Sequence, residues 1–176
     1  MPELTVGERV DPDAIARRVD AADPAHASLA SGREALARIA RALEAARDLT
    51  VETTLSGRQP LDLMQRARDR GYHVSLIFVG TADPKLNIER VRRRISAGGH
   101  AIADDDVRRR FDRSLANLPR ATALADAVAV FDNSGEPRQL RVVYDRDEGR
   151  EHLVADAPRW LTAQGTLPRP ELPTRP

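Results

Sequence analysis

Apolar residues along the chain alternate between helical spacing and extended runs. Leu36, Ile39 and Leu43 recur at helical intervals within a helix predicted over residues 33–47. Residues 73–79 are instead nearly continuous in apolar side chains, which is typical of a strand buried in a parallel sheet. Because helices and strands alternate in this way, the sequence predicts an α/β domain with a mostly parallel sheet flanked by helices.

The same patterns predict the remaining elements. Helices are expected at residues 14–19, at 61–70, from Pro84 to the Gly98-Gly99 pair, and at 104–118, and strands at 49–54, 127–131 and 139–144. Prolines at positions 168, 170, 173 and 176 predict a disordered tail over residues 163–176. We therefore expect one domain over residues 1–162.

Composition and charge narrow the classes of function. The formal net charge is +1 although 31% of the residues are charged, so bulk charge does not predict nucleic-acid binding. The absence of cysteine excludes disulfides, thiol catalysis and zinc–thiolate sites. No basic leader precedes a long apolar run, and no stretch approaches about 18 apolar residues, so we expect a cytoplasmic protein without a membrane partner.

Two carboxylates, Asp11 and Asp13, follow the end of an early predicted strand. Ligands of α/β sheets bind at the carboxyl ends of strands, so Asp13 is a candidate general base or metal-associated acid. The alternative is that Asp13 is the N-cap of the following helix, where a carboxylate accepts a backbone N–H. The local sequence leaves both interpretations open.

A second polar segment follows the strand at 49–54. Alternation along this strand places Glu52 and Thr54 on one face. A buried carboxylate at Glu52 needs partners, which substrate hydroxyls or arginines could supply. Ordinary loop capping is the alternative.

Two arginine-bearing helices lie on either side of Gly98-Gly99. Arg90 and Arg94 belong to the first helix, and Arg110 and Arg113 to the second. A glycine hinge between them would make residues 86–118 a mobile lid over phosphates, because guanidinium groups stay charged and bind oxygens bidentately. The alternative is a solvated arginine face.

Five segments occur in order and carry a family resemblance: Asp11-Pro12-Asp13-Ala14-Ile15-Ala16, Glu52-Thr53-Thr54-Leu55-Ser56-Gly57, Arg90-Val91-x-x-Arg94-x-x-x-Gly98-Gly99-His100, Arg109-Arg110-Phe111-x-Arg113-Ser114-Leu115-x-Asn117-Leu118 and Asp132-Asn133-Ser134. The series, within residues 7–144, resembles the bacterial zeta-toxin-like ATPase/kinase family of P-loop kinases. The resemblance implies a parallel sheet flanked by helices, with ATP and Mg²⁺ as cofactors. Toxin members phosphorylate a hydroxyl of the nucleotide sugar UDP-N-acetylglucosamine and are held inactive by an antitoxin protein.

The resemblance also implies roles for individual residues. Asp13 matches the carboxylate that accepts the substrate hydroxyl proton, and Glu52, Thr53 and Thr54 match the substrate-contacting loop. The lid arginines would neutralise phosphates; of these, Arg94 and Arg110 are the catalytic candidates, and Arg90 and Arg113 the cofactor-binding ones.

The phosphate-binding loop of that family is absent from the 176 residues. A Gly-x-x-x-x-Gly-Lys-Ser/Thr loop cradles phosphates with its N–H groups, reaches them with its lysine and holds Mg²⁺ with its hydroxyl. Here Val6 is followed directly by Gly7, and Lys85, the only lysine, follows no glycine-rich turn. If residues 4–6 and 9–10 are parallel neighbouring strands, a crossover of roughly a dozen residues is missing between them.

We therefore expect a zeta-toxin-like kinase of a small hydroxylated substrate that is impaired in catalysis. The alternative is a non-catalytic module that binds a nucleotide sugar or a protein. An RNA-binding module is the least favoured, because no aromatic residues are interleaved with the arginines and the net charge is near zero.

Overall fold

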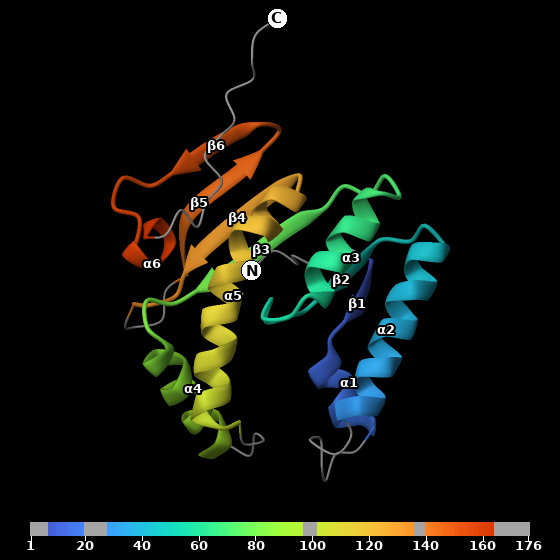
Figure 1. Ribbon diagram of the computed structural model, residues 1–176, viewed down its shortest axis with the longest axis horizontal. Helices are drawn as coiled ribbons and strands as arrows, with labels where there is room; N and C mark the ends of the chain where they lie inside the picture. Colours follow the sequence, from blue (N-terminus) through green and yellow to red (C-terminus); the bar gives the residue numbers. More distant parts are fainter. Residues whose placement is uncertain (1–6, 20–27, 97–101, 136–139, 164–176) are drawn as a thin grey trace, which may run out of the picture. The chain divides into compact units, whose positions relative to one another are not determined.

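The computed structural model describes residues 7–19, 28–96, 102–135 and 140–163 (Figure 1). The chain forms two compact units, Met1–Thr53 and Thr54–Pro176, and each is described by itself. The strand expected at residues 4–6, the Gly98-Gly99 hinge with His100, and the tail beyond Ala163 lie outside the described residues. Among the residues described, no helix is both long and apolar enough to cross a membrane.

The first unit is a parallel strand pair joined through two helices. Its elements are β1 (Glu8–Val10), α1 (Pro12–Val19), α2 (Ser28–Glu44) and β2 (Leu49–Val51). β1 and β2 are parallel, with Val10 opposite Val51. A parallel pair needs a long crossover, and the segment containing α1 and α2 supplies it. The core of the unit consists of Val10, Ile15, Ala16, Ala35, Ile39, Ala42 and Leu43.

Gly7, directly before β1, has a conformation that requires glycine. Its φ is +68°, and a Cβ atom at this position would lie 2.0 Å from the backbone oxygen of Asp48. That oxygen also accepts a hydrogen bond from the Glu8 N–H, at 3.0 Å, so the backbone cannot move away without loss of the contact.

Gly7→Ala is therefore expected to destabilise the first unit by about 1–3 kcal/mol. Chemical denaturation followed by circular dichroism measures the change. Gly32→Ala is the matched control, because Gly32 lies within α2 with no atom within 4 Å of a new Cβ, and alanine favours helix there by about 0.5–1 kcal/mol. Equal stability of the two variants would contradict the prediction.

The second unit contains a four-stranded sheet with helices. Its elements are α3 (Gln59–Arg68), β3 (Ser75–Gly80), α4 (Pro84–Ser96), α5 (Asp104–Leu124), β4 (Ala127–Asp132), β5 (Arg141–Asp147), β6 (Arg150–Leu153) and α6 (Arg159–Thr162). The sheet order is β3-β4-β5-β6. β3 and β4 are parallel, whereas β4–β5 and β5–β6 are antiparallel. The α/β class is confirmed, but the sheet is mixed rather than mostly parallel.

The sequence analysis missed β6, which makes a hairpin with β5. Asp147 pairs with Arg150, and the two residues between them, Glu148 and Gly149, have φ values of 47° and 75°. Positive φ at both central residues is the geometry of a type I′ turn, whose backbone twist suits a two-residue hairpin. Every residue of β6 is exposed, so the strand leaves no apolar pattern in the sequence.

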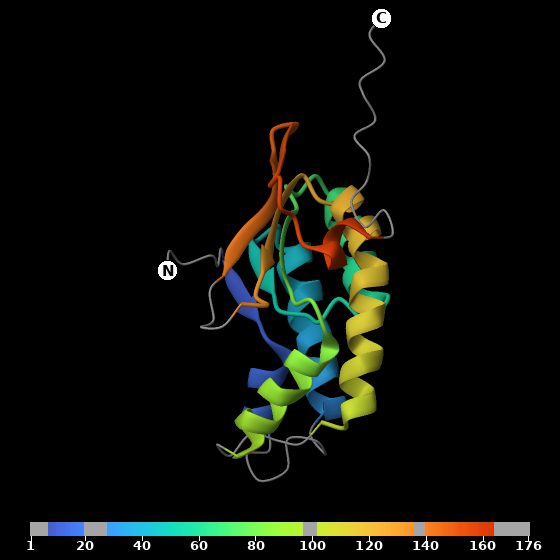
Figure 2. The same cartoon turned by 90° about the vertical axis from the view of Figure 1, so that its left-hand side faces the viewer.

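The helices α5 and α6 lie against one face of the sheet (Figure 2). Leu118, Val130, Val143 and Leu161 are fully buried between these layers. α5 continues past Pro119 to Leu124, beyond the end predicted at residue 118. The reason is that Ala121 and Thr122, in the additional turn, are also buried.

β3 is buried on one face, not on both as its apolar run predicts. Phe78 and Gly80 are buried, but Ile77 and Val79 are 44% and 50% exposed. These two residues alternate with the buried ones along the strand and so belong to the opposite face of the sheet. The other predicted elements are present, with ends that differ by a few residues.

Candidate functional site

The end of β1 resolves the competing interpretations of its two carboxylates. Asp11 is the N-cap of α1: its Oδ1 accepts a hydrogen bond from the Ala14 N–H at 3.0 Å. Pro12 follows at the first helical position, where its lack of an N–H costs nothing. Helix capping by Asp13 is therefore wrong. Asp13 lies in the first turn of α1, and its role as a base stays a prediction.

Glu52 is held by Arg9 on the surface of the first unit. The Arg9 guanidinium donates to Glu52 Oε1 and lies 3.8 Å from Asp11 Oδ2. The side chain of Glu52 is 49% exposed, so the expected buried carboxylate is wrong. Glu52 is exposed because β2 ends at Val51, the residue before it, and not at residue 54 as predicted. The Glu52 N–H still donates to Val10 O, at 3.0 Å.

The loop after β2 is hydrogen-bonded to α5 within the second unit. Asn117 Nδ2 donates to the carbonyls of Leu55, at 2.8 Å, and Gly57, at 3.2 Å. Leu55 has a φ of 55°, a strained value for leucine, which its burial in the core and the Asn117 contact maintain. Thr54 Oγ1 lies 2.8 Å from Ser56 Oγ. The substrate-binding roles of Thr53 and Thr54 stay predictions.

The carboxyl ends of β3 and β4 are joined by a compact set of hydrogen bonds. The Asn133 N–H donates to Gly80 O at 2.9 Å, and the Ala82 N–H donates to Ser134 Oγ at 2.8 Å. Ser134 Oγ in turn donates to Asp132 Oδ1 at 2.5 Å. Asp132-Asn133-Ser134 is therefore more than a plain turn, because it fixes the two strand ends to each other.

Trp160 of α6 packs onto these strand ends. Its Nε1–H donates to Asp132 Oδ1 at 3.1 Å, and its ring lies 6.2 Å from that of Phe78. A Cβ atom on Gly80 would lie 2.3 Å from the tryptophan ring, so only glycine fits beneath it. The sequence analysis missed this contact, although the chain has a single tryptophan.

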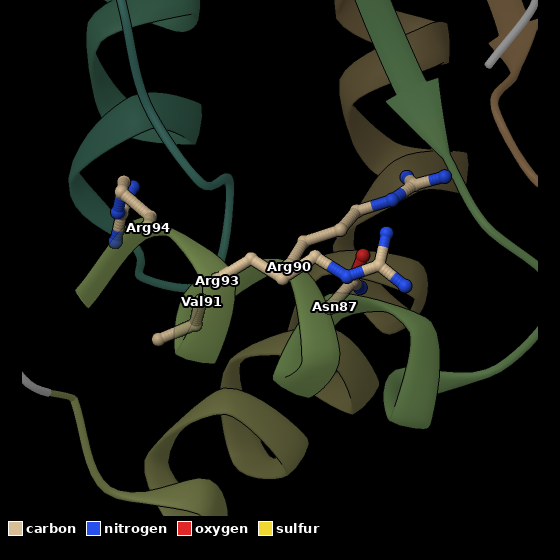
Figure 3. Close-up of a pocket in the computed structure, with 5 residues that line it drawn as sticks. All are labelled: Asn87, Arg90, Val91, Arg93 and Arg94. Carbon is tan, nitrogen blue, oxygen red and sulfur yellow. The ribbon is translucent and has the colours of Figure 1, made fainter. Parts of the chain in front are cut away.

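One face of α4, next to these strand ends, lines a pocket of about 540 Å³ (Figure 3). Its lining residues are Asn87, Arg90, Val91, Arg93 and Arg94. In Figure 3, Arg90 and Arg93 extend in the direction of Asn87, whereas Arg94 extends the opposite way. Arg90 and Arg94 were expected from the sequence, but Asn87 and Arg93 were not.

Hydrogen bonds to the strand ends fix two of the lining residues. Arg90 Nη2 donates to the Asn133 carbonyl at 2.7 Å. Thr81 Oγ1, just after β3, donates to Asn87 Oδ1 at 3.2 Å. Within the described ranges, Arg93 and Arg94 have neither a hydrogen bond nor an ion pair from their side chains. The guanidinium groups of Arg93 and Arg94 are therefore paired with no carboxylate of the described residues.

Arg110 and Arg113 do not take part in the α4 pocket. Both are exposed on α5, and neither lines the α4 pocket. Of the predicted lid arginines, only Arg90 and Arg94 line the α4 pocket, and their side chains extend in opposite directions. The expectation that Arg94 and Arg110 meet Asp13 and Glu52 in one cleft concerns both units and stays a prediction.

The residues do not fit Mg²⁺-bound ATP in the manner of a P-loop. Lys85 is exposed in the first turn of α4, and its N–H donates to Asp83 Oδ1 at 2.8 Å, so no glycine-rich loop presents it. Among the described residues, no group of three or more acidic or histidine side chains could hold a metal ion.

Comparison with known proteins places the chain beside one relative. No protein-family model matches the chain, and no solved structure matches it. A protein of Haemophilus influenzae, described as uncharacterized, is 31% identical over 102 residues, which cover 58% of this chain and 73% of that protein. This description assigns no activity to either protein. The chain belongs to the same family as this Haemophilus influenzae protein.

Proposed function

We propose that this chain is a zeta-toxin-like protein that binds the phosphate groups of a small hydroxylated ligand, such as a nucleotide sugar, and is impaired as a kinase. The observation that carries the proposal is the α4 pocket, which Asn87, Arg90, Arg93 and Arg94 line and in whose lining no carboxylate of the described residues takes part. Guanidinium groups bind phosphate oxygens strongly, because each hydrogen bond is assisted by charge.

The position of the pocket supports this proposal. Ligands of open α/β sheets bind beyond the carboxyl ends of parallel strands. α4 begins four residues after β3, and Arg90 contacts the residue after β4, so the pocket lies beside the ends of a parallel pair. A diphosphate carries several acceptor oxygens, enough to engage more than one arginine.

The impairment rests on the phosphate-binding loop that the 176 residues lack. Phosphoryl transfer depends mainly on positioning and charge stabilisation, which that loop provides. A non-catalytic module that binds a nucleotide sugar, or a protein such as an antitoxin, is the second candidate. Failure to phosphorylate a nucleotide sugar after that loop has been restored would favour this second candidate.

We expect the purified chain to bind UDP-N-acetylglucosamine in calorimetric titration and to turn over ATP no faster than background. Arg93→Gln should weaken binding about tenfold or more, because a hydrogen bond to a charged group contributes about 1.5–3 kcal/mol. Arg120→Gln is the matched control, since Arg120 is exposed on α5 and does not line the pocket.

Two results would count against the proposal. If Arg93→Gln and Arg120→Gln bound equally well, the ligand would not occupy the α4 pocket. If the chain phosphorylated a nucleotide sugar and Asp13→Ala abolished that activity, the kinase would not be impaired.

A further inference from the structure

We propose that Ser134 is a positioning residue of the α4 pocket: its hydroxyl fixes the Asn133 carbonyl, and that carbonyl holds Arg90 in place to receive a phosphate group. The inference rests on the proposed phosphate binding and adds a residue that does not itself line the pocket. It follows from the hydrogen bonds at the carboxyl ends of β3 and β4.

Arg90 differs from the other two arginines of the lining. It is half-buried, and its Nη2 donates to the Asn133 carbonyl at 2.7 Å. Arg93 and Arg94 are exposed, and their side chains make no hydrogen bond or ion pair within the part of the chain that the structure describes. A long side chain that is held in place before binding loses less conformational entropy when a ligand arrives. The contribution of Arg90 therefore depends on the carbonyl that holds it.

That carbonyl belongs to the planar peptide group between Asn133 and Ser134. Asn133, on one side of the group, is held by its N–H, which donates to Gly80 O at 2.9 Å. Ser134, on the other side, is held by its hydroxyl. Its Oγ accepts a hydrogen bond from the Ala82 N–H at 2.8 Å and donates one to Asp132 Oδ1 at 2.5 Å. Because the residues on both sides are held, the carbonyl keeps its direction toward the arginine.

Only a hydroxyl side chain can make both contacts of Ser134, because Oγ accepts and donates at once. Threonine can replace it in these two roles, and alanine can fill neither. Ala82 lies two residues before Pro84, where α4 begins. The same hydroxyl therefore joins the turn that carries the carbonyl to the segment that leads into the helix of Arg90.

The amino ends of the same two strands provide a matched control. Asp126, directly before β4, accepts at Oδ2 a hydrogen bond of 2.8 Å from the N–H of Val74, directly before β3. This contact also joins β3 and β4 through one side chain, but at the end of the strands away from α4. Asp126→Ala is therefore expected to lower stability without releasing Arg90.

The first measurement is made on the free protein. Nitrogen-15 relaxation of the Arg90 Nε–H group, identified by the loss of its signal in Arg90→Gln, reports how far the side chain is restrained. In Ser134→Ala this group should become as mobile as the side chains of the exposed arginines. In Ser134→Thr and Asp126→Ala it should stay as restrained as in the wild type.

The second measurement is an NMR titration of the full chain with inorganic phosphate at constant ionic strength. Ser134→Ala should weaken phosphate binding about threefold to tenfold, because Arg90 must then be immobilised by the ligand. Ser134→Thr and Asp126→Ala should bind phosphate within about twofold of the wild type.

A double-mutant cycle shows whether Ser134 acts through Arg90. Arg90→Gln should weaken phosphate binding about tenfold or more. In the Arg90→Gln background, Ser134→Ala should change the affinity by no more than about twofold, because the side chain that it positions is already gone. A merely structural role of Ser134 would instead give additive losses.

The outcomes separate this inference from the function on which it rests. If the wild type bound no phosphate, the proposed function would fail and the inference with it. If the wild type bound phosphate but the two losses were additive, or Arg90 stayed restrained in Ser134→Ala, phosphate binding would stand and the positioning role would be wrong. The same conclusion would follow if Asp126→Ala weakened binding as much as Ser134→Ala, or if Ser134→Thr behaved as Ser134→Ala does.

Discussion

Gly80→Ala is expected to lower the free energy of unfolding of the second unit by about 1–3 kcal/mol, because the new methyl group overlaps the Trp160 ring. Displacement of that ring also breaks the hydrogen bond from Trp160 Nε1 to Asp132 and the contact with Phe78. Urea denaturation followed by circular dichroism measures the effect, and it also serves for variants that lack Trp160, the only tryptophan.

Anion binding should weaken in the same variant. Gly80 O accepts the Asn133 N–H, and the Asn133 carbonyl holds Arg90, so a shift at Gly80 moves a pocket arginine. Gly57→Ala is the control, because a Cβ atom there meets no atom within 4 Å. The second change Trp160→Leu should restore part of the stability lost in Gly80→Ala, because it removes the overlapping ring. Additive losses in the double variant would show that the ring overlap is not the cause.

The elements that the sequence predicts are those with an apolar face to bury. Val107 and Leu118 of α5, at helical spacing, are both buried, and Phe78 and Val130 of the paired strands are buried as well. In β6 all four residues are exposed, so no alternation of apolar and polar residues indicates this strand in the sequence. Its pairing depends instead on the turn at Glu148-Gly149, whose conformation is encoded in two residues.

The candidate site could be predicted only in part, because hydrogen-bond partners distant in sequence decide it. The arginines of α4 alone indicate this helix as a candidate binding site. Its residues Arg90 and Asn87, however, are oriented by hydrogen bonds with Asn133 and Thr81 respectively. The contact between Arg90 and Asn133 joins residues 43 positions apart. Local sequence likewise cannot tell which carboxylate caps α1. The geometry selects Asp11, because its side chain reaches the Ala14 N–H.

The removal of Asp13 from the capping role bears on the kinase hypothesis. Capping was the structural explanation for a carboxylate at that position, and Asp11 already fills the role. The proton-accepting role that the family resemblance implies for Asp13 stays a prediction. Whether it retains that role depends on a phosphate donor, which the present chain has no loop to hold.

Inserting a phosphate-binding loop and its helix between Val6 and Gly7, taken from an active zeta-toxin-like kinase, is expected to give ATP-dependent phosphorylation of a nucleotide sugar. Turnover should rise from background toward the range of about 1–100 per second that is typical of kinases. The junction leaves Gly7 unchanged, because β1 begins directly after it and its φ of +68° and close contact with Asp48 allow no other residue there.

Controls in the repaired chain assign the activity to its parts. Alanine in place of the inserted lysine should leave the fold intact and remove turnover, since that side chain reaches the β- and γ-phosphates. Asp13→Asn should reduce turnover at least about a hundredfold if Asp13 accepts the hydroxyl proton. A radiolabelled-phosphate assay with UDP-N-acetylglucosamine measures both effects.

The repaired chain could instead bind ATP tightly yet phosphorylate neither this nor another small hydroxylated substrate. That result would show that the chain lacks the catalytic residues of a kinase even when a phosphate donor is bound. The kinase hypothesis would then be wrong, and the binding module would be preferred.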